Sequence, residues 1–93
     1  MSEKGKVQVS VVVLPKAEIL DPQGKAVLGS LKSLGFDEVA DCRIGKVVRL
    51  TLNGDGSDNA LIRRKVSDMA SSLLSNPITE DFEIVFDKGD ESK

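Results

Sequence analysis

The stretch KVQVSVVVL, residues 6–14, alternates apolar and polar positions in its first half and is rich in β-branched valine. Such alternation predicts a strand, because successive side chains of a strand point to opposite faces of a sheet. One face of this strand carries Val7, Val9, Val11 and Val13. Val12 and Leu14 lie on the other face. The chain must therefore fold around a sheet, and its other segments have to supply strand partners and a cover.

A first helix is predicted to begin directly after Asp21. Aspartate is a good N-cap residue, and Pro22 stands at the first helical position, where proline is favoured. The helix is expected to end at Gly35, since glycine is the usual residue just beyond a helix. Its apolar stripe consists of Val27, Leu28, Leu31 and Leu34.

The next segment predicts an antiparallel hairpin. Gly45-Lys46 is a two-residue turn with glycine first, so residues 38–44 and 47–52 are expected to pair. The face expected to point toward the helices carries Val39, Val48, Leu50 and Leu52. The opposite face carries Ala40, Cys42, Ile44 and Val47.

A second helix follows the polar loop NGDGSDN, residues 53–59, and is expected to end near Asn76-Pro77. Its predicted buried stripe is Ile62, Val66, Met69, Ala70 and Leu73. The stretch FEIVF, 82–86, predicts a fourth strand. The order β-α-β-β-α-β predicts an α+β, ferredoxin-like fold, with a four-stranded antiparallel sheet and two helices on one face. We expect one domain over residues 1–93, with an ordered core of about 6–86 and a flexible tail at 87–93.

The sheet face turned away from the helices is predicted to be apolar and uncovered. It would carry Val12, Leu14, Ala40, Cys42, Ile44 and Val47. A monomer rarely exposes such a patch, so we expect this face to pack against another copy or another protein. The alternative is a hairpin register slipped by one residue, which would exchange the two faces.

Composition excludes several classes of function. The 93 residues contain no histidine and a single cysteine, Cys42, which excludes an internal disulfide and argues against multi-cysteine metal sites. A net charge of −2 argues against broad attraction to nucleic acid, and the predicted central strands lack the aromatic residues on which RNA-binding modules stack bases. No apolar run spans a membrane, and MSEKGK lacks the apolar stretch of a signal peptide, so we expect a cytoplasmic protein.

Gly24, inside the first turn of the first helix, has two interpretations. It is not part of a P-loop or a dinucleotide fingerprint, so close packing of the helix against the sheet or a neighbouring subunit is favoured over anion binding at the helix N-terminus. The loop at 53–59 resembles a calcium loop, but Asp58 and Arg64 stand where glycine and glutamate are required. Asp41 and Arg43 share a face of the predicted strand and could pair with each other or with a partner.

Three blocks of sequence resemble the PurS family, the small subunit of phosphoribosylformylglycinamidine synthase in purine biosynthesis. They are ILDPQGKAV at 19–27, EVADCRIGKVVRLTL at 38–52, and the L-L-x-N…E-D segment at 73–81. The resemblance extends from about Lys6 to Phe86, and only the loop GDGSDN and the tail DKGDESK depart from the shared blocks.

This resemblance implies a subunit without catalytic residues and without a cofactor or metal of its own. It would form a homo-oligomer, dimer or tetramer, and join the large synthetase subunit (PurL) to the glutaminase subunit (PurQ). ATP, Mg²⁺ and glutamine would be used by the complex, and the small subunit would help ammonia to pass between the two sites. The matching positions for partner contact are Asp21, Gln23, Gly24, Arg43 and Lys46. The alternative is a stand-alone small-ligand-binding or regulatory domain.

Overall fold

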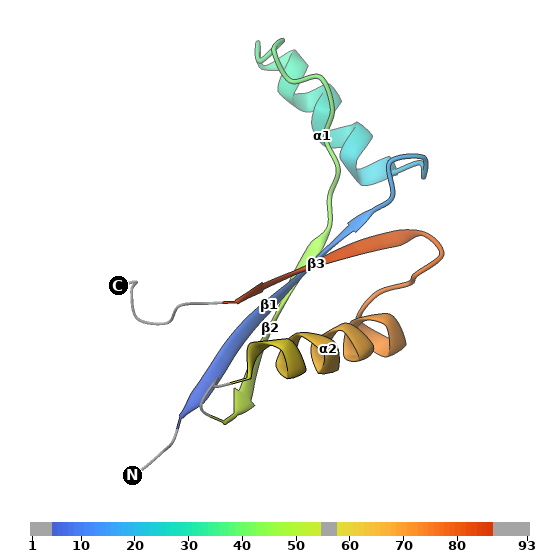
Figure 1. Cartoon of the computed structure of the whole chain (residues 1–93). Coiled ribbons are helices and arrows are strands. Elements are labelled where there is room, and N and C mark those ends of the chain that lie inside the picture. The colour runs from blue at the N-terminus through green and yellow to red at the C-terminus, as the bar shows by residue number, and fades with distance from the viewer. Residues whose placement is uncertain (1–4, 55–57, 87–93) are drawn as a thin grey trace.

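The computed structural model describes residues 5–54 and 58–86 of the chain. Its elements are β1 (Lys6–Pro15), α1 (Pro22–Ser33), β2 (Lys46–Asn53), α2 (Asn59–Met69), the π-helical turn η1 (Ala70–Leu74) and β3 (Glu80–Phe86) (Figure 1). Within the described residues, the strands form one antiparallel sheet in the order β2-β1-β3. The α+β class with two helices is therefore confirmed. The predictions for the tail at 87–93 and for 55–57 of the polar loop lie outside the described residues.

The hydrophobic core lies on one face of this sheet, beneath α2. Val9, Val11 and Val13 of β1 are at most 1% exposed, and they pack with Val66 and Ala70. The partly buried residues around them are Val7, Val48, Leu50, Leu52, Ile62, Leu74, Phe82, Ile84 and Phe86. The predicted inward faces of the first strand and of residues 47–52 are therefore confirmed.

The predicted hairpin at Gly45-Lys46 is wrong. Residues 38–44 form no strand, and β2 pairs directly with β1, with Val11 opposite Val48. Gly45 does not turn the chain: it lies so close to β1 that an added Cβ atom would overlap the Val13 carbonyl oxygen. Glycine is needed here for close approach of two backbones. The described part of the chain therefore has three strands, and the expected four-stranded ferredoxin-like sheet is not formed within it.

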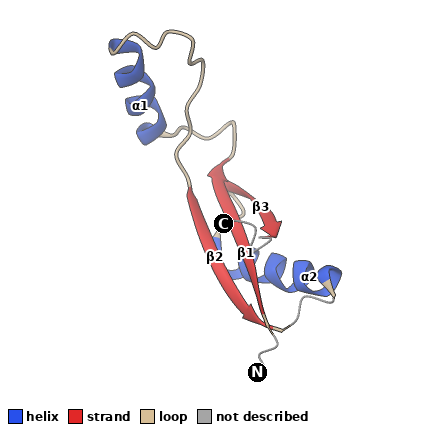
Figure 2. Ribbon diagram, turned by 90° about the vertical axis from the view of Figure 1, so that its left-hand side faces the viewer, coloured by secondary structure: helices blue, strands red, loops and turns tan. Residues whose placement is uncertain are grey.

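Helix α1 does not cover the sheet, contrary to the prediction of two helices on one face. It projects beyond the end of the sheet, while α2 lies against the sheet (Figures 1 and 2). The molecule measures 53 × 33 × 15 Å, and its radius of gyration of 17.0 Å exceeds the roughly 12 Å of a compact chain of this length. We call residues 22–40 the arm, and residues 15–21 and 41–45, which connect it to the sheet, the neck.

The end of the second helix also departs from its prediction. In η1 the Ser75 N–H donates to the Ala70 carbonyl, five residues earlier, so this turn is wider than an α-helical one. The wider turn shifts the apolar stripe, so that Leu74 packs on the core while Leu73 is 82% exposed. Met69 is also exposed. Among the described helices, none is long and apolar enough to cross a membrane.

Candidate functional site

The neck is organised by the carboxylate of Asp21. One oxygen, Oδ1, accepts the Gly24 N–H at 3.1 Å and caps α1, as the sequence predicts. The other oxygen, Oδ2, accepts the Ile44 N–H at 2.8 Å. The second bond was not predicted, and it ties the start of α1 to the segment that enters β2.

Gly24 brings α1 against the same returning segment. It is buried, and a Cβ atom added to it would overlap the Cys42 carbonyl oxygen and lie 2.6 Å from Asp21 Oδ2. The predicted close packing at Gly24 is found, but the surface that the helix approaches is the backbone of Cys42 in the neck, and not the sheet that the prediction named.

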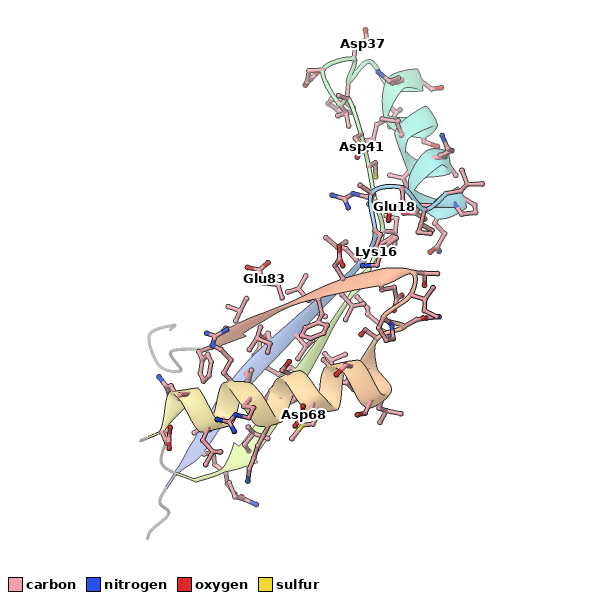
Figure 3. The ribbon with its side chains drawn as sticks, turned by 45° about the vertical axis from the view of Figure 1, so that its right-hand side comes forward. Lys16, Glu18, Asp37, Asp41, Asp68 and Glu83 are labelled. Atoms are coloured by element: carbon pink, nitrogen blue, oxygen red, sulfur yellow. The ribbon has the colours of Figure 1, made fainter. Side chains whose placement is uncertain are left out.

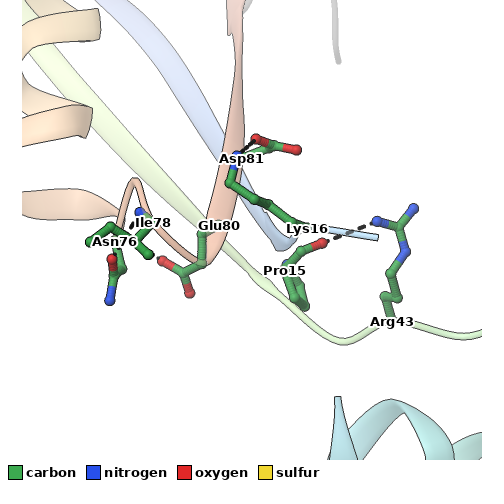
Figure 4. Close-up of polar contacts among 7 residues, drawn as sticks. All are labelled: Pro15, Lys16, Arg43, Asn76, Ile78, Glu80 and Asp81. Atoms are coloured by element: carbon green, nitrogen blue, oxygen red, sulfur yellow. Dashed lines mark hydrogen bonds and ion pairs between the residues drawn. The ribbon is translucent and has the colours of Figure 1, made fainter. Parts of the chain in front are cut away.

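Arg43 connects the two segments of the neck, residues 15–21 and 41–45. Its Nη1 donates to the Pro15 carbonyl at 3.1 Å, which joins the end of β1 to the segment before β2 (Figure 4). Its Nε lies 3.7 Å from Asp41 Oδ2, so of the two alternatives left open by the sequence the structure has the pairing of these side chains with each other. Figure 3 shows Glu18 and Asp41 in the neck and Asp37 at the far end of the arm.

Residues 73–81, the third block that resembles the PurS family, contact Lys16, which directly follows β1. Lys16 Nζ lies 2.6 Å from Asp81 Oδ1 (Figure 4). The Lys16 N–H donates to the Thr79 carbonyl at 2.9 Å. The hydrogen bond to Asp81 is the main cause that raises the pKa of Lys16. The Ile19 N–H also donates to the Lys16 carbonyl at 3.0 Å, so each of the segments 19–27, 38–52 and 73–81 contacts Pro15 or Lys16.

The turn before β3 is held by its own polar groups. The Asn76 N–H donates to Glu80 Oε1 at 2.7 Å, and Asn76 Oδ1 accepts the Ile78 N–H at 3.0 Å (Figure 4). The Ile78 side chain is 81% exposed on this turn. An Asn-Pro pair after a helix is a typical turn signal, since an asparagine side chain often bonds the backbone two residues on, and it could have indicated this arrangement.

The electrostatics of the neck favour an ionised Asp21. The Ile44 N–H is the main cause that lowers the pKa of this carboxyl, followed by the Gly24 N–H, and the charge of Arg43 adds to the effect. Beside it lies a cavity of about 310 Å³. Its lining residues are Ala17, Glu18, Ile19, Leu20, Asp21, Lys25, Leu28, Asp41, Cys42 and Arg43. In residues 5–54 and 58–86, no group of three His, Cys, Asp or Glu side chains could hold a metal ion.

The residues predicted to form one oligomer interface are divided between two places. Val12 and Val47 lie opposite each other in adjacent strands and share the open sheet face with Leu14. Cys42 lines the neck cavity, Ala40 is exposed in the arm, and Ile44 lies in the neck. The prediction of a single continuous apolar face is wrong, because residues 38–44 do not pair as a strand of the sheet.

The open sheet face mixes apolar and charged side chains. At its end near the neck, Glu83 of β3 lies opposite Val12 (Figure 3). Farther along, Arg49 Nε donates to Ser10 Oγ at 3.0 Å, and Val85 is exposed. The other predicted contact residues, Gln23 and Lys46, are exposed.

These features define a small α+β protein with one covered sheet face and an arm that projects from the end of the sheet. The family model described as "PurS: Phosphoribosylformylglycinamidine (FGAM) synthase" matches residues 8–88. The chain therefore belongs to the PurS family, whose members are subunits of FGAM synthase in purine biosynthesis.

Individual relatives agree with this family. The FGAM synthase subunit PurS of Bacillus subtilis is 40% identical over 75 residues, which cover 81% of this chain and 86% of the relative. A crystal form of B. subtilis PurS superposes with a TM-score of 0.70 at 36% identity, covering 88% of this chain and 99% of the other. The structure of PurLQS from Thermotoga maritima contains a chain of the same fold, with a TM-score of 0.76 at 21% identity, covering 88% of this chain and 98% of the other.

Proposed function

We propose that this chain is the assembly subunit of an FGAM synthase complex, which joins a glutaminase subunit to an ATP-dependent synthetase subunit. The observation that carries the proposal is the family match over residues 8–88. The T. maritima structure is of PurLQS, and we infer that the corresponding PurL and PurQ subunits are the partners here. ATP, Mg²⁺ and glutamine are then bound by those subunits, in the cytoplasm, and this chain helps to enclose the path of ammonia between them.

The contact with the larger subunits is proposed to lie at the neck and at the start of β2. Lys46 is exposed there, and Arg43 keeps part of its guanidinium accessible beside Asp41. Both cations fit an acidic or carbonyl-rich surface. Arg43 also bonds the Pro15 carbonyl, so it has a structural role that Lys46 does not share.

A homo-oligomer is supported by the apolar side chains that this chain leaves uncovered. The exposed apolar residues of the arm and of the segment that leads into it are Leu20, Val27, Leu34 and Phe36. Val47 is exposed on the open sheet face, and it pairs with Val12. Apolar surface of this kind is typical of a protein interface, and we propose that a second copy covers it.

The fourth strand of the ferredoxin-like sheet is proposed to form between copies. The segment that returns from α1 runs on into β2 without reversing direction (Figure 2). The outer edge of β2 has no strand partner among the described residues. Residues 38–44 of one copy can therefore pair with β2 of another, which exchanges the predicted hairpin contact between chains.

The decisive experiment is a reconstitution with the matching large and glutaminase subunits. Glutamine-dependent formation of formylglycinamidine ribonucleotide is measured with and without this chain, and the molar mass of each mixture is determined by light scattering. We expect both the activity and the larger complex to require the chain. Activity and mass that do not depend on the chain would contradict the proposal.

Contacts at the neck are tested by Lys46→Ala and by the double variant with Arg43→Ala. Lys46→Ala is expected to weaken complex formation while the fold is kept, and the double variant, which also loses the bond to the Pro15 carbonyl, should weaken it further. The matched control is Arg64→Ala, an exposed cation on α2. Val47→Asp tests the contact between copies, and it should give folded chains of monomer mass. An unchanged complex, or an unchanged oligomer, would refute the respective assignment.

The alternative, a stand-alone small-ligand domain, would use the cavity beside Asp21. A specific ligand should then raise the melting temperature of the isolated chain. A thermal-shift screen with nucleotides, glutamine and glutamate separates this function from assembly, for which none of these compounds is expected to shift the melting temperature.

A further inference from the structure

The two helices are capped by aspartates with different reach. Asp58 caps α2, and its Oδ1 accepts the Leu61 N–H at 3.0 Å, three residues along the chain. Asp21 makes the equivalent bond to the Gly24 N–H, but its second oxygen also accepts the Ile44 N–H, 23 residues away. The Asp58 bond is local to its helix, whereas the carboxylate of Asp21 connects the arm to the segment that enters the sheet.

The arm is attached to the rest of the molecule through the neck. Helix α1 lies beyond the end of the sheet and rests on neither of its faces (Figures 1 and 2). Its direction is therefore set by the neck contacts. One of these is the bond of Asp21 Oδ2 to the Ile44 N–H, and another is the packing of Gly24, whose own N–H bonds Asp21 Oδ1, against the Cys42 backbone.

We propose that Asp21 is a positioning residue, whose carboxylate locks the arm at a fixed angle to the sheet before any partner binds. The chemistry requires two acceptor oxygens that face two N–H groups from opposite sides of the neck. An ionised carboxylate supplies both, whereas an asparagine amide supplies one acceptor and one donor group. The lowered pKa of Asp21 agrees with this arrangement, because the donors stabilise the charged form.

A locked arm matters for assembly, and this part of the inference rests on the proposed function. A flexible arm would have to be ordered at the moment of binding, which costs affinity. An arm that is already held presents its apolar residues in one orientation. Loosening it should therefore raise the concentration of chain at which the complex forms, while the activity of the complete complex is kept.

The first test is amide hydrogen exchange in the full chain, with Asp21→Asn compared with Asp58→Asn. Asparagine is itself a good N-cap residue, so Asp21→Asn retains the bond to the Gly24 N–H and places an amide donor against the Ile44 N–H. We expect exchange of the Ile44 amide to become about ten-fold faster and that of Gly24 to change little. Asp58→Asn should leave both amides unchanged.

The second test measures the orientation of the arm. Spin labels are placed at Ser33 in the arm and Thr51 on β2, with Cys42→Ser to remove the native thiol. The labelled chain is diluted with unlabelled chain, so that only distances within one copy are read. Asp21→Asn should broaden and shift the distance distribution, whereas Asp58→Asn should reproduce the parent distribution.

A parent-like distribution together with a protected Ile44 amide in Asp21→Asn would overturn the proposal. If Asp21→Asn does not fold, as judged by circular dichroism, Asp21→Ser takes its place, because serine also caps a helix but offers a single oxygen. Both measurements use the chain without the larger subunits, diluted until light scattering gives the molar mass of a monomer, so that no second copy holds the arm. They therefore decide the locking of the arm even if the chain fails to join any complex.

The assembly part is read by titrating each variant into the matching large and glutaminase subunits. Asp21→Asn should raise the concentration for half-maximal glutamine-dependent activity and leave the plateau unchanged, and Asp58→Asn should change neither. A lowered maximal activity with an unchanged concentration for half-maximal activity would contradict a positioning role. If the parent chain itself has no effect, the proposed function fails while the locking of the arm stands on the exchange and distance results.

Discussion

Helices α1 and α2 begin in the same way and end in different surroundings. Both follow an aspartate cap, and they are of similar length, 12 and 11 residues. α2 places Val66 against the valines of β1, whereas the one buried residue of α1 is Gly24. The difference teaches that an apolar stripe predicts that a helix will be covered, but not by which chain. A stripe left open in one chain indicates a partner.

The largest effect that tests this comparison comes from a charge placed on each stripe. Val66→Asp would bury an unpaired carboxylate in a small core, and we expect it to lower the free energy of unfolding by about 4 kcal/mol. Leu28→Asp, on the half-buried stripe of α1, should leave the sheet and α2 folded. Chemical denaturation followed by circular dichroism measures both.

The same pair of variants also separates folding from assembly. Leu28→Asp is expected to lower the molar mass of the oligomer, because the arm carries exposed apolar residues that need a cover. If Leu28→Asp unfolds the whole chain at the concentration where the parent is folded, the two helices are equally part of one core. The proposed difference, that α2 is covered within the chain and α1 by a partner, would then be wrong.

A smaller effect is expected from two glycines of α1. Gly24→Ala places a methyl group on the Cys42 carbonyl and the Asp21 carboxylate, and such overpacking costs roughly 1–3 kcal/mol. Gly29→Ala meets no atom within 4 Å, and it should stabilise the helix by about 0.5–1 kcal/mol. The melting temperature should therefore fall for Gly24→Ala and rise for Gly29→Ala. Equal shifts of the two melting temperatures would show that close packing at Gly24 in the neck does not contribute to stability.

The smallest effect is a dependence of stability on acid pH. The pKa of Asp21 is lowered in the folded chain, so the unfolded state binds more protons, and stability falls as the pH falls. The contribution of Asp21 is complete above the ordinary aspartate pKa of about 3.9 and is lost as the pH drops through the lowered value.

Other charged groups line the same cavity. They are Glu18, Lys25, Asp41 and Arg43. The contribution of Asp21 is therefore taken as the difference between the parent and Asp21→Asn in unfolding curves from pH 7 to pH 3. Parallel curves would show that the carboxylate bonds do not contribute to stability.

Much of the fold could be predicted because its signals are local. The alternation of β1, the cap at Asp21 and the stop near Gly35 each depend on neighbouring residues, and the structure has all three. Gly35 adopts a φ of +101°, the backbone conformation that glycine favours at a helix end. The inward faces of β1 and β2 follow from strand periodicity once the strands are known.

The hairpin could not be predicted correctly, because what Gly45 does depends on a residue far away in sequence. A glycine that turns the chain and a glycine that lies against another backbone look alike in sequence, and here the Val13 carbonyl decides. The second bond of Asp21 was missed for the same reason, since nothing local indicates that Ile44 lies beside it. The motifs of the candidate site were found, but their geometry depends on the path of the arm.

The elongated outline of the molecule affects how it moves through water. A 10.0 kDa chain that extends over 53 Å meets more friction than a sphere of the same mass. On a column calibrated with compact proteins, it should therefore elute early, and a single copy can resemble a dimer. Sedimentation should show the opposite deviation, with a coefficient below that of a compact protein. The arm thus gives the free subunit a hydrodynamic signature, which should diminish when the arm packs against a partner.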